Sequence, residues 1–260
     1  MLLAIDIGNT NIHLGLWGSD SWRLSWRART VENKMPDEYA VLVRNFLATA
    51  DVGSGAITSV VVSSVVPPLT HAFTELSRRY LHQEPIVVRH DTPTGVIIDV
   101  DQPQQVGADR IVNAAGIVAN HSYPAIAIDF GTATTFDVIS GEGALIGVAI
   151  APGIGVAHDA LVDRAARLHK VDLEPPPSPI GRNTIHALQS GIFWGYIGLV
   201  EGLVKRLKDE LTDERVTVYA TGGLATIFDQ HTDVIDEIIP ELTLDGLRAI
   251  HALHQQKNPA

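Results

Sequence analysis

Two short stretches of this sequence repeat one pattern of residues that can do chemistry. In AIDIGNTN (4–11) and AIDFGTATT (127–135), an apolar run ends in an aspartate, followed by a glycine and short polar residues. The glycine allows a tight turn, and backbone N–H groups of such turns form nests that bind anions. Mg²⁺ is commonly held by one or two carboxylates together with substrate phosphates, which explains an aspartate beside an anion nest. The pair predicts two hairpins that clamp a polyphosphate, although each alone also fits an ordinary turn.

Two further stretches have residues that could form binding or catalytic sites beside these hairpins. VYATGGLA (218–225) reads as a strand that delivers paired glycines to the start of a helix, where a nucleotide can approach the backbone. GADR (107–110) reads as the start of another helix, where the positive end of the helix dipole keeps Asp109 ionised. The alternatives are a plain strand-to-helix turn for the first and a helix-terminal charge for the second.

Composition excludes several classes of protein and site. The chain of 260 residues has no cysteine, which excludes disulfides, thiolate zinc sites and a cysteine nucleophile. Its formal charge of −11, without a basic cluster, argues against a nucleic acid partner. No apolar run approaches the roughly 18 residues of a membrane span, and the N-terminus lacks the basic region of a signal peptide. We therefore expect a cytoplasmic protein without a membrane or nucleic acid partner.

The elements that must position these motifs follow the same plan in each half of the chain. Residues 2–29 and 124–152 each read as three consecutive strands, and each set is followed by helices and a further strand. The other expected strands are 57–66 and 215–221, and the expected helices are 36–50, 69–82, 107–120, 154–169, 184–211 and 241–256. This order predicts an α/β protein of two related domains with mixed sheets, 1–121 and 122–260, and a cleft between them, which the resemblance described next implies to be the interdomain ATP cleft.

The ordered set of motifs resembles a known superfamily. Asp-x-Gly-Asn-Thr, Asp-x-Gly-Thr-Ala-Thr and Thr-Gly-Gly are similar to the two phosphate motifs and the adenosine motif of the acetate and sugar kinase/Hsp70/actin superfamily. PQQVGADR (103–110), APGIG (151–155) and the stretch from Gly181 to Lys208 resemble type III pantothenate kinases. The resemblance runs from residue 3 to about residue 250. It implies two ribonuclease-H-like (actin-like) domains and ATP-dependent phosphorylation of pantothenate to 4'-phosphopantothenate, the first step of coenzyme A biosynthesis. It also implies Mg²⁺, a monovalent cation (K⁺ or NH₄⁺) and a homodimer with pantothenate bound near the interface.

The resemblance also implies roles for individual residues. Asp109 is the expected general base, Arg110 the partner of the pantothenate carboxylate, Asp6 the Mg²⁺ residue and Asp129 the monovalent cation residue. The residues implied for ATP and its phosphates are Asp6, Ile7, Gly8, Asn9, Thr10, Asn11, Ile12, His13, Thr132, Gly222 and Gly223. Those implied for pantothenate are Gly107, Ala108, Asp109, Arg110 and Thr184. Taken alone, Arg110 also fits a surface ion pair, and Thr184 fits the first turn of a helix capped by Asn183.

One position departs from the family pattern. Val100 stands where the family commonly has a tyrosine that contacts pantothenate, so a hydroxyl contact is lost there. This departure leaves open a kinase of the same superfamily for another small hydroxyl substrate. A third hypothesis is a non-catalytic nucleotide-binding regulator, against which the set of Asp6, Asp109, Arg110 and Asp129 argues.

Overall fold

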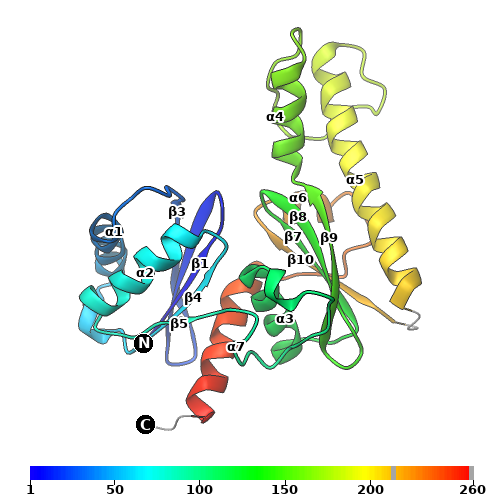
Figure 1. Cartoon of the computed structure of the whole chain (residues 1–260). Helices are drawn as coiled ribbons and strands as arrows, with labels where there is room; N and C mark the ends of the chain where they lie inside the picture. The colour runs from blue at the N-terminus through cyan, green and yellow to red at the C-terminus, as the bar shows by residue number, and fades with distance from the viewer. Residues whose placement is uncertain (212–214, 258–260) are drawn as a thin grey trace. The chain divides into compact units, whose positions relative to one another are not determined.

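The chain forms two compact units. A computed structural model describes residues 1–211 and 215–257. One unit contains residues 1–121 together with the segment that begins at Glu241, and the other contains residues 122–240 (Figure 1). The final helix belongs to the first unit, whereas the sequence analysis placed it in a second domain of 122–260, whose last three residues lie outside the described ranges.

The first unit is built on a mixed sheet with the strand order β3-β2-β1-β4-β5. Its strands are β1 (Leu2–Ile7), β2 (Asn11–Gly18), β3 (Ser21–Arg29), β4 (Ser59–Ser64) and β5 (Ile86–Val87). β1 is antiparallel to β2 and parallel to β4. The first unit also contains the short strand β6 (Ile97–Ile98) and 3-10 turns at Ser54–Ala56 and Pro103–Gln105.

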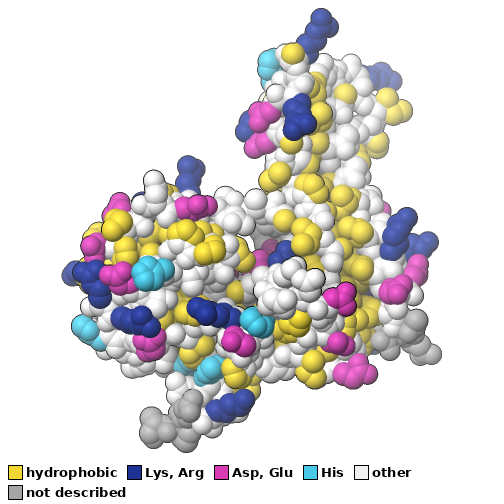
Figure 2. Space-filling view, in the orientation of Figure 1, with side chains coloured by type: hydrophobic (Ala, Val, Ile, Leu, Met, Phe, Trp, Pro, Cys, Tyr) yellow, Lys and Arg dark blue, Asp and Glu magenta, His cyan; other side chains and the backbone are white. Residues whose placement is uncertain are grey.

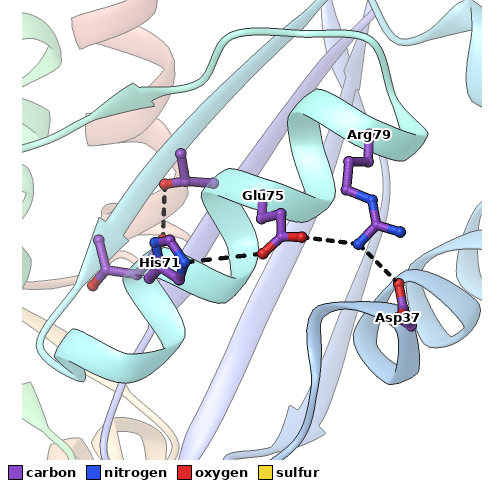
Figure 3. A network of polar contacts seen from close by, with 6 residues as sticks. Asp37, His71, Glu75 and Arg79 are labelled. Carbon is purple, nitrogen blue, oxygen red and sulfur yellow. Dashed lines mark hydrogen bonds and ion pairs between the residues drawn. The ribbon is translucent and has the colours of Figure 1, made fainter.

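Helices cover both faces of this sheet. On one face Leu3, Ile5 and Ile7 pack against the buried residues of α1 (Pro36–Thr49) and α2 (Pro67–Tyr80). α2 begins at Pro67, two residues before the expected start, because proline is well tolerated in the first turn of a helix. Figure 3 shows exposed polar contacts of these helices: within α2 Glu75 contacts His71 and Arg79, and Arg79 lies 3.4 Å from Asp37 of α1. Such exposed contacts contribute little to stability.

The opposite face explains why the final helix belongs to the first unit. Leu2 and Ala4 of β1 share one buried cluster with residues of α3 (Ala108–Asn120) and α7 (Leu242–Lys257). Leu244, Leu247 and Ile250 of α7 are fully buried there. The spacing of these residues predicts a buried helical face, but it does not specify the sheet against which that face packs.

The second unit repeats the strand plan of the first. Its strands are β7 (Ala125–Phe130), β8 (Ala133–Ile139), β9 (Ala144–Pro152), β10 (Thr217–Gly222) and β11 (Glu237–Ile238), in the order β11-β10-β7-β8-β9. β7 is antiparallel to β8 and parallel to β10, as β1 is to β2 and β4. The expected mixed sheets of two related halves are therefore present.

The helices of the second unit are α4 (Ile154–Arg164), α5 (Thr184–Leu211) and α6 (Ala225–Asp229). α4 is shorter than the expected helix 154–169. α5 is long and apolar enough to cross a membrane by length and composition alone, which the sequence analysis did not anticipate. One side of α5, with Phe193, Ile197 and Val200, is buried in the hydrophobic core of this unit.

Candidate active site

The β1–β2 hairpin presents the first predicted phosphate turn. Asp6 is half-buried near the end of β1, and the side chains of Asn9, Thr10 and Asn11 are exposed. The turn is closed by a bond from Gly8 N to Asn11 O of 3.0 Å. Thr30, after β3, supports the turn because its hydroxyl donates to Gly8 O at 2.6 Å and its amide to Thr10 O at 2.9 Å. The fully buried Ile7 and Ile12 anchor the hairpin in the core.

The β7–β8 hairpin presents the second turn. Asp129 is paired in register with Thr135, and Gly131 N donates to Ala133 O at 3.1 Å, so this turn is tighter than the first. Thr132 is exposed at its tip, and its carbonyl accepts a bond from Gly153 N at 3.0 Å. A side chain at Gly153 would collide with the carbonyl oxygens of Gly131 and Thr132. The glycine of APGIG therefore lets the start of α4 pack closely on this hairpin.

The paired glycines after β10 lie beside Asp129. In the parallel ladder of β10 and β7, Thr221 pairs with Asp129 and Gly222 with Phe130. Gly222 has a φ of +93°, and a Cβ atom there would lie 2.8 Å from Asp129 Oδ1 and 2.6 Å from Phe130 O. Gly223 is exposed, with open space where a Cβ would stand. The structure thus brings together Asp129 and the first glycine of the pair.

The first turn of α3 holds Asp109 and Arg110 side by side. Asp109 Oδ1 accepts a bond from Arg110 N at 2.9 Å and lies 3.4 Å from Arg110 Nη1. A Cβ atom at Gly107 would collide with the Asp109 carboxylate and lie 2.7 Å from Arg110 Nη1. Only glycine at position 107 therefore lets both side chains lie against the backbone. The Arg110 side chain is 17% exposed and that of Asp109 32%, so this ion pair is partly buried.

The packing of α3 associates this turn with the sheet face that carries Asp6. Ala108 shares a buried cluster with Ala4 of β1 and Val61 of β4. Ala4 pairs with Val61 in the ladder, and Asp6 pairs with Ser63, which is the next position on the same face. Ser63 is fully buried, and its hydroxyl has no hydrogen-bond partner in the described part of the chain. Ser63 was not predicted from the sequence, although it comes directly after the apolar run of β4.

His13, expected among the ATP and phosphate residues, lies close to Glu241, the residue just before α7. It is opposite Asp6 in the β1–β2 ladder, and its Nε2 lies 3.4 Å from Glu241 Oε2. Burial and the charge of Arg27 lower the pKa of His13 to about 4, and burial raises the pKa of Glu241. His13 is therefore neutral at pH 7. No sequence signal pointed to Glu241, because only the tertiary fold brings it to His13.

The remaining predicted residues lie on other elements. Val100 is half-buried in the segment after β6. Thr184 is the exposed first residue of α5, and Asn183 caps this helix by accepting a bond from His186 N at 2.8 Å. Thr184 lines an apolar pocket of about 450 Å³ together with Leu161 of α4 and Leu188 of α5. Within residues 1–211 and 215–257, no three His, Asp or Glu side chains are grouped as a metal site.

Comparison with known proteins gives a consistent picture. The sequence model of the family described as type III pantothenate kinase matches residues 2–206. Relatives of that name from Roseiflexus sp. (strain RS-1) and Brevibacillus brevis are 47% and 44% identical, and each comparison covers 98% of this chain and 100% of the relative.

Solved structures with low sequence identity share the fold. A protein from Campylobacter jejuni described as a Baf family transcriptional activator has a TM-score of 0.60 at 20% identity, covering 99% of this chain and 98% of that protein. The activator of the 2-hydroxyisocaproyl-CoA dehydratase from Clostridium difficile, with bound ADPNP, has a TM-score of 0.53 at 12% identity, covering 100% and 97%. These likenesses concern the fold alone, and they confirm the expected actin-like α/β architecture.

Proposed function

The chain belongs to the type III pantothenate kinase family, and we propose from this premise how its own residues carry out the reaction. It is a pantothenate kinase, which transfers a phosphoryl group from ATP to pantothenate in coenzyme A biosynthesis. The observation that carries the residue assignment is the pairing of Asp109 and Arg110 on the first turn of α3. Phosphoryl transfer depends mainly on positioning and on neutralising charge, and these two side chains supply both for the acceptor.

Asp109 acts as the general base and Arg110 as the binding group for pantothenate. Arg110 holds the pantothenate carboxylate, because a guanidinium presents a planar fork of donors that matches it. Asp109 accepts the proton of the attacking hydroxyl, a role that contributes typically 10²–10⁴-fold to the rate. Both side chains leave the same first turn of α3, so the longer Arg110 can reach the carboxylate end of the substrate while Asp109 accepts the proton at its hydroxyl end. Gly107 and Ala108 leave the backbone open to this substrate, and Thr184 adds a contact from α5.

The β1–β2 hairpin, residues 6–13, binds the ATP phosphates. Asn9, Thr10 and Asn11 are exposed donors on a turn that Thr30 holds in place, which suits an anion site. Thr132 donates from the β7–β8 hairpin, and Gly222 and Gly223 contact the adenosine.

Kinases of this family use ATP with a divalent metal ion. We assign Mg²⁺ to Asp6, since a single carboxylate with substrate phosphates is a common way to hold it. Asp6 fits this assignment because its half-buried carboxylate offers the oxygen donors that Mg²⁺ prefers. When bound, the ion neutralises charge on the phosphates. A monovalent cation, K⁺ or NH₄⁺, is assigned to Asp129, whose carboxylate lies beside Gly222.

The functional form is a cytoplasmic homodimer that joins through its second unit. Large apolar side chains are exposed around α4 and the start of α5, and Figure 2 shows hydrophobic side chains gathered over these helices. They are Ile150, Val156, Leu161, Ile180 and Ile185. Exposed apolar groups of this kind mark protein interfaces. This surface therefore supports a dimer in which a second copy of the chain covers these side chains. α5 is packed in the core of this unit, which supports a protein free of the membrane.

A coupled assay of ADP release tests this assignment. Purified protein with Mg²⁺, K⁺ and ATP is expected to release ADP only when pantothenate is added, and omission of K⁺ is expected to lower the rate. Asp109→Asn is expected to lower kcat by at least about 10²-fold while ADP binding, followed by calorimetry, stays unchanged. Wild-type turnover in this variant would exclude Asp109 as the base.

A further inference from the structure

A row of polar side chains crosses the first sheet at the level of the phosphate hairpin. In the β1–β4 ladder Asp6 pairs with Ser63, in the β1–β2 ladder it pairs with His13, and in the β2–β3 ladder His13 pairs with Arg27. Side chains that are directly opposite in a ladder share one face of the sheet and lie about 4.5–5.5 Å apart at Cβ. The four residues therefore form a continuous row on one face, with Asp6 next to His13.

Glu241 lies over this row. Its Oε2 is 3.4 Å from His13 Nε2, and its Oε1 accepts a bond of 3.5 Å from Ser25 of β3. The charge of Arg27 acts on both His13 and Glu241. The His13 side chain is only 13% exposed, and within the described ranges neither its Nε2 nor Glu241 Oε2 has a hydrogen-bond partner, because their contact is close in distance but lacks hydrogen-bond geometry. Two buried polar atoms left without a bond are costly, so each is the natural partner of the other.

The contact joins a neutral imidazole to a carboxylate. Because His13 is neutral at pH 7, Nε2–H can donate to Glu241, which fixes the plane of the ring and its tautomer. The distance of 3.4 Å is long for such a bond. Hydrogen bonds around active sites are often long without substrate and shorten when it binds.

The support beneath Glu241 is rigid. Glu241 immediately precedes α7, whose Leu242, Leu244 and Leu247 are fully buried. One turn further along, Asp245 accepts a bond from Trp22 Nε1 at 2.9 Å, which fixes α7 to β3. Glu241 is also the first residue after the second unit, which ends at Pro240. The Glu241 carboxylate is therefore held firmly enough to position the His13 ring. It also lies where the chain re-enters the first unit.

We propose that Glu241 is a positioning residue for ATP binding: it holds the His13 imidazole and thereby fixes the strand that carries the phosphate turn opposite Asp6. The inference rests on the proposed role of the β1–β2 hairpin. It adds a residue from the far end of the sequence to the nucleotide half of the site. The contribution is to ATP binding rather than to the acceptor, because Glu241 faces His13 and not the Asp109–Arg110 turn in the contacts that it makes.

The test compares Glu241→Ala, Glu241→Gln, His13→Ala and the double variant His13→Ala/Glu241→Ala. We expect Glu241→Ala to raise KM for ATP and the Kd of ADP, measured by calorimetry, about tenfold, with less than twofold change in KM for pantothenate. Glu241→Gln keeps the volume and one acceptor oxygen, so a rise of about threefold is expected. The double variant is expected to bind ADP no more weakly than His13→Ala alone, because the two residues act as one unit.

Asp245→Asn is the matched control. It changes a carboxylate one turn along the same helix but keeps an acceptor oxygen for Trp22 Nε1, so the bond between α7 and β3 can remain and KM for ATP is expected to stay within twofold of the wild-type value. The inference is overturned if the Glu241 variants bind ADP like this control, or if the effects of His13→Ala and Glu241→Ala multiply. If the alanine variant does not fold, Glu241→Gln alone decides, by its Kd for ADP. Asp6→Asn separates the two proposals: if it retains full activity, the hairpin assignment fails, whereas an inactive Asp6→Asn with normal Glu241 variants removes only this inference.

Discussion

The backbone of Gly246 in α7 packs directly against the carbonyl group of Val112 in α3. A Cβ atom at position 246 would collide with that carbonyl oxygen and lie 2.9 Å from Val112 Cγ1. Gly116 of α3 is similarly close to Leu242, since a Cβ there would lie 2.9 Å from the Leu242 carbonyl oxygen. The two glycines let α3 and α7 cross at close range, and both the Asp109 turn and Glu241 depend on that crossing for their positions.

The first prediction concerns this crossing. Gly246→Ala is expected to lower the free energy of unfolding by about 3 kcal/mol, because backbone atoms rather than a flexible side chain block the added methyl group. Urea unfolding followed by tryptophan fluorescence measures the change. Gly198→Ala, in the interior of α5 with open space around it, is the control and is expected to be neutral or to stabilise by up to about 1 kcal/mol. Equal stability of the two variants would contradict the close crossing.

The local elements of the fold and the site could be predicted from the sequence, whereas contacts between distant segments could not. The Asp-x-Gly motifs were sufficient to predict both hairpins, because glycine and short polar residues after a buried strand are local signals. Asp109 and Arg110 could be placed on a first helical turn for the same reason. The location of α7 and the contact of Glu241 with His13 could not be predicted, since the apolar spacing of α7 indicates a buried face without its partner. Gly222 beside Asp129 likewise depends on the β10–β7 register.

Arg110→Lys tests recognition of the pantothenate carboxylate. Lysine keeps the charge but loses the planar fork, so KM for pantothenate is expected to rise about tenfold, and about a hundredfold in Arg110→Gln. KM for ATP is expected to change less than twofold. Steady-state kinetics with varied pantothenate measure this effect. Arg78→Lys, at an exposed Arg–Glu84 pair, is the control, and an equal response of the two lysine variants would argue against a substrate contact.

Val100→Tyr tests the position that departs from the family pattern. A tyrosine hydroxyl at this half-buried position is expected to lower KM for pantothenate by a factor of about three to ten, which corresponds to one ordinary hydrogen bond. Val100→Phe adds the ring without the hydroxyl and separates packing from hydrogen bonding. If the tyrosine and phenylalanine variants have the same KM, the hydroxyl makes no contact there.

Ile180→Asp tests the proposed dimer surface. Ile180 is 77% exposed, and a buried carboxylate at an interface is costly, so the dimer is expected to dissociate at least tenfold more readily. Light scattering after size-exclusion chromatography distinguishes the 28.0 kDa chain from twice that mass. Leu24→Asp, on an apolar residue of β3 that is 41% exposed, is expected to leave the mass unchanged. A monomeric wild-type protein would refute the dimer, and a dimeric Ile180→Asp would exclude this residue from its interface.

The last prediction is a pH dependence of stability caused by His13. Burial, together with the charge of Arg27, lowers the pKa of His13 from 6.5 in the unfolded chain to about 4 in the folded protein. Between these values the unfolded chain binds a proton that the folded protein does not, so stability falls as the pH falls from about 6.5 to about 4. The slope from this one group is at most about 1.4 kcal/mol per pH unit.

Glu241 has the opposite effect, because burial raises its pKa and the folded protein then binds the extra proton. The comparison is therefore made without this carboxylate, between Glu241→Gln and His13→Gln/Glu241→Gln. Only the variant that retains His13 is expected to lose stability relative to the other as the pH falls, and the two curves are expected to run parallel above about pH 7. Urea unfolding across this range gives both curves. Parallel curves down to pH 4 would mean that His13 takes up its proton equally well in the folded protein, and would contradict its burial as a neutral group.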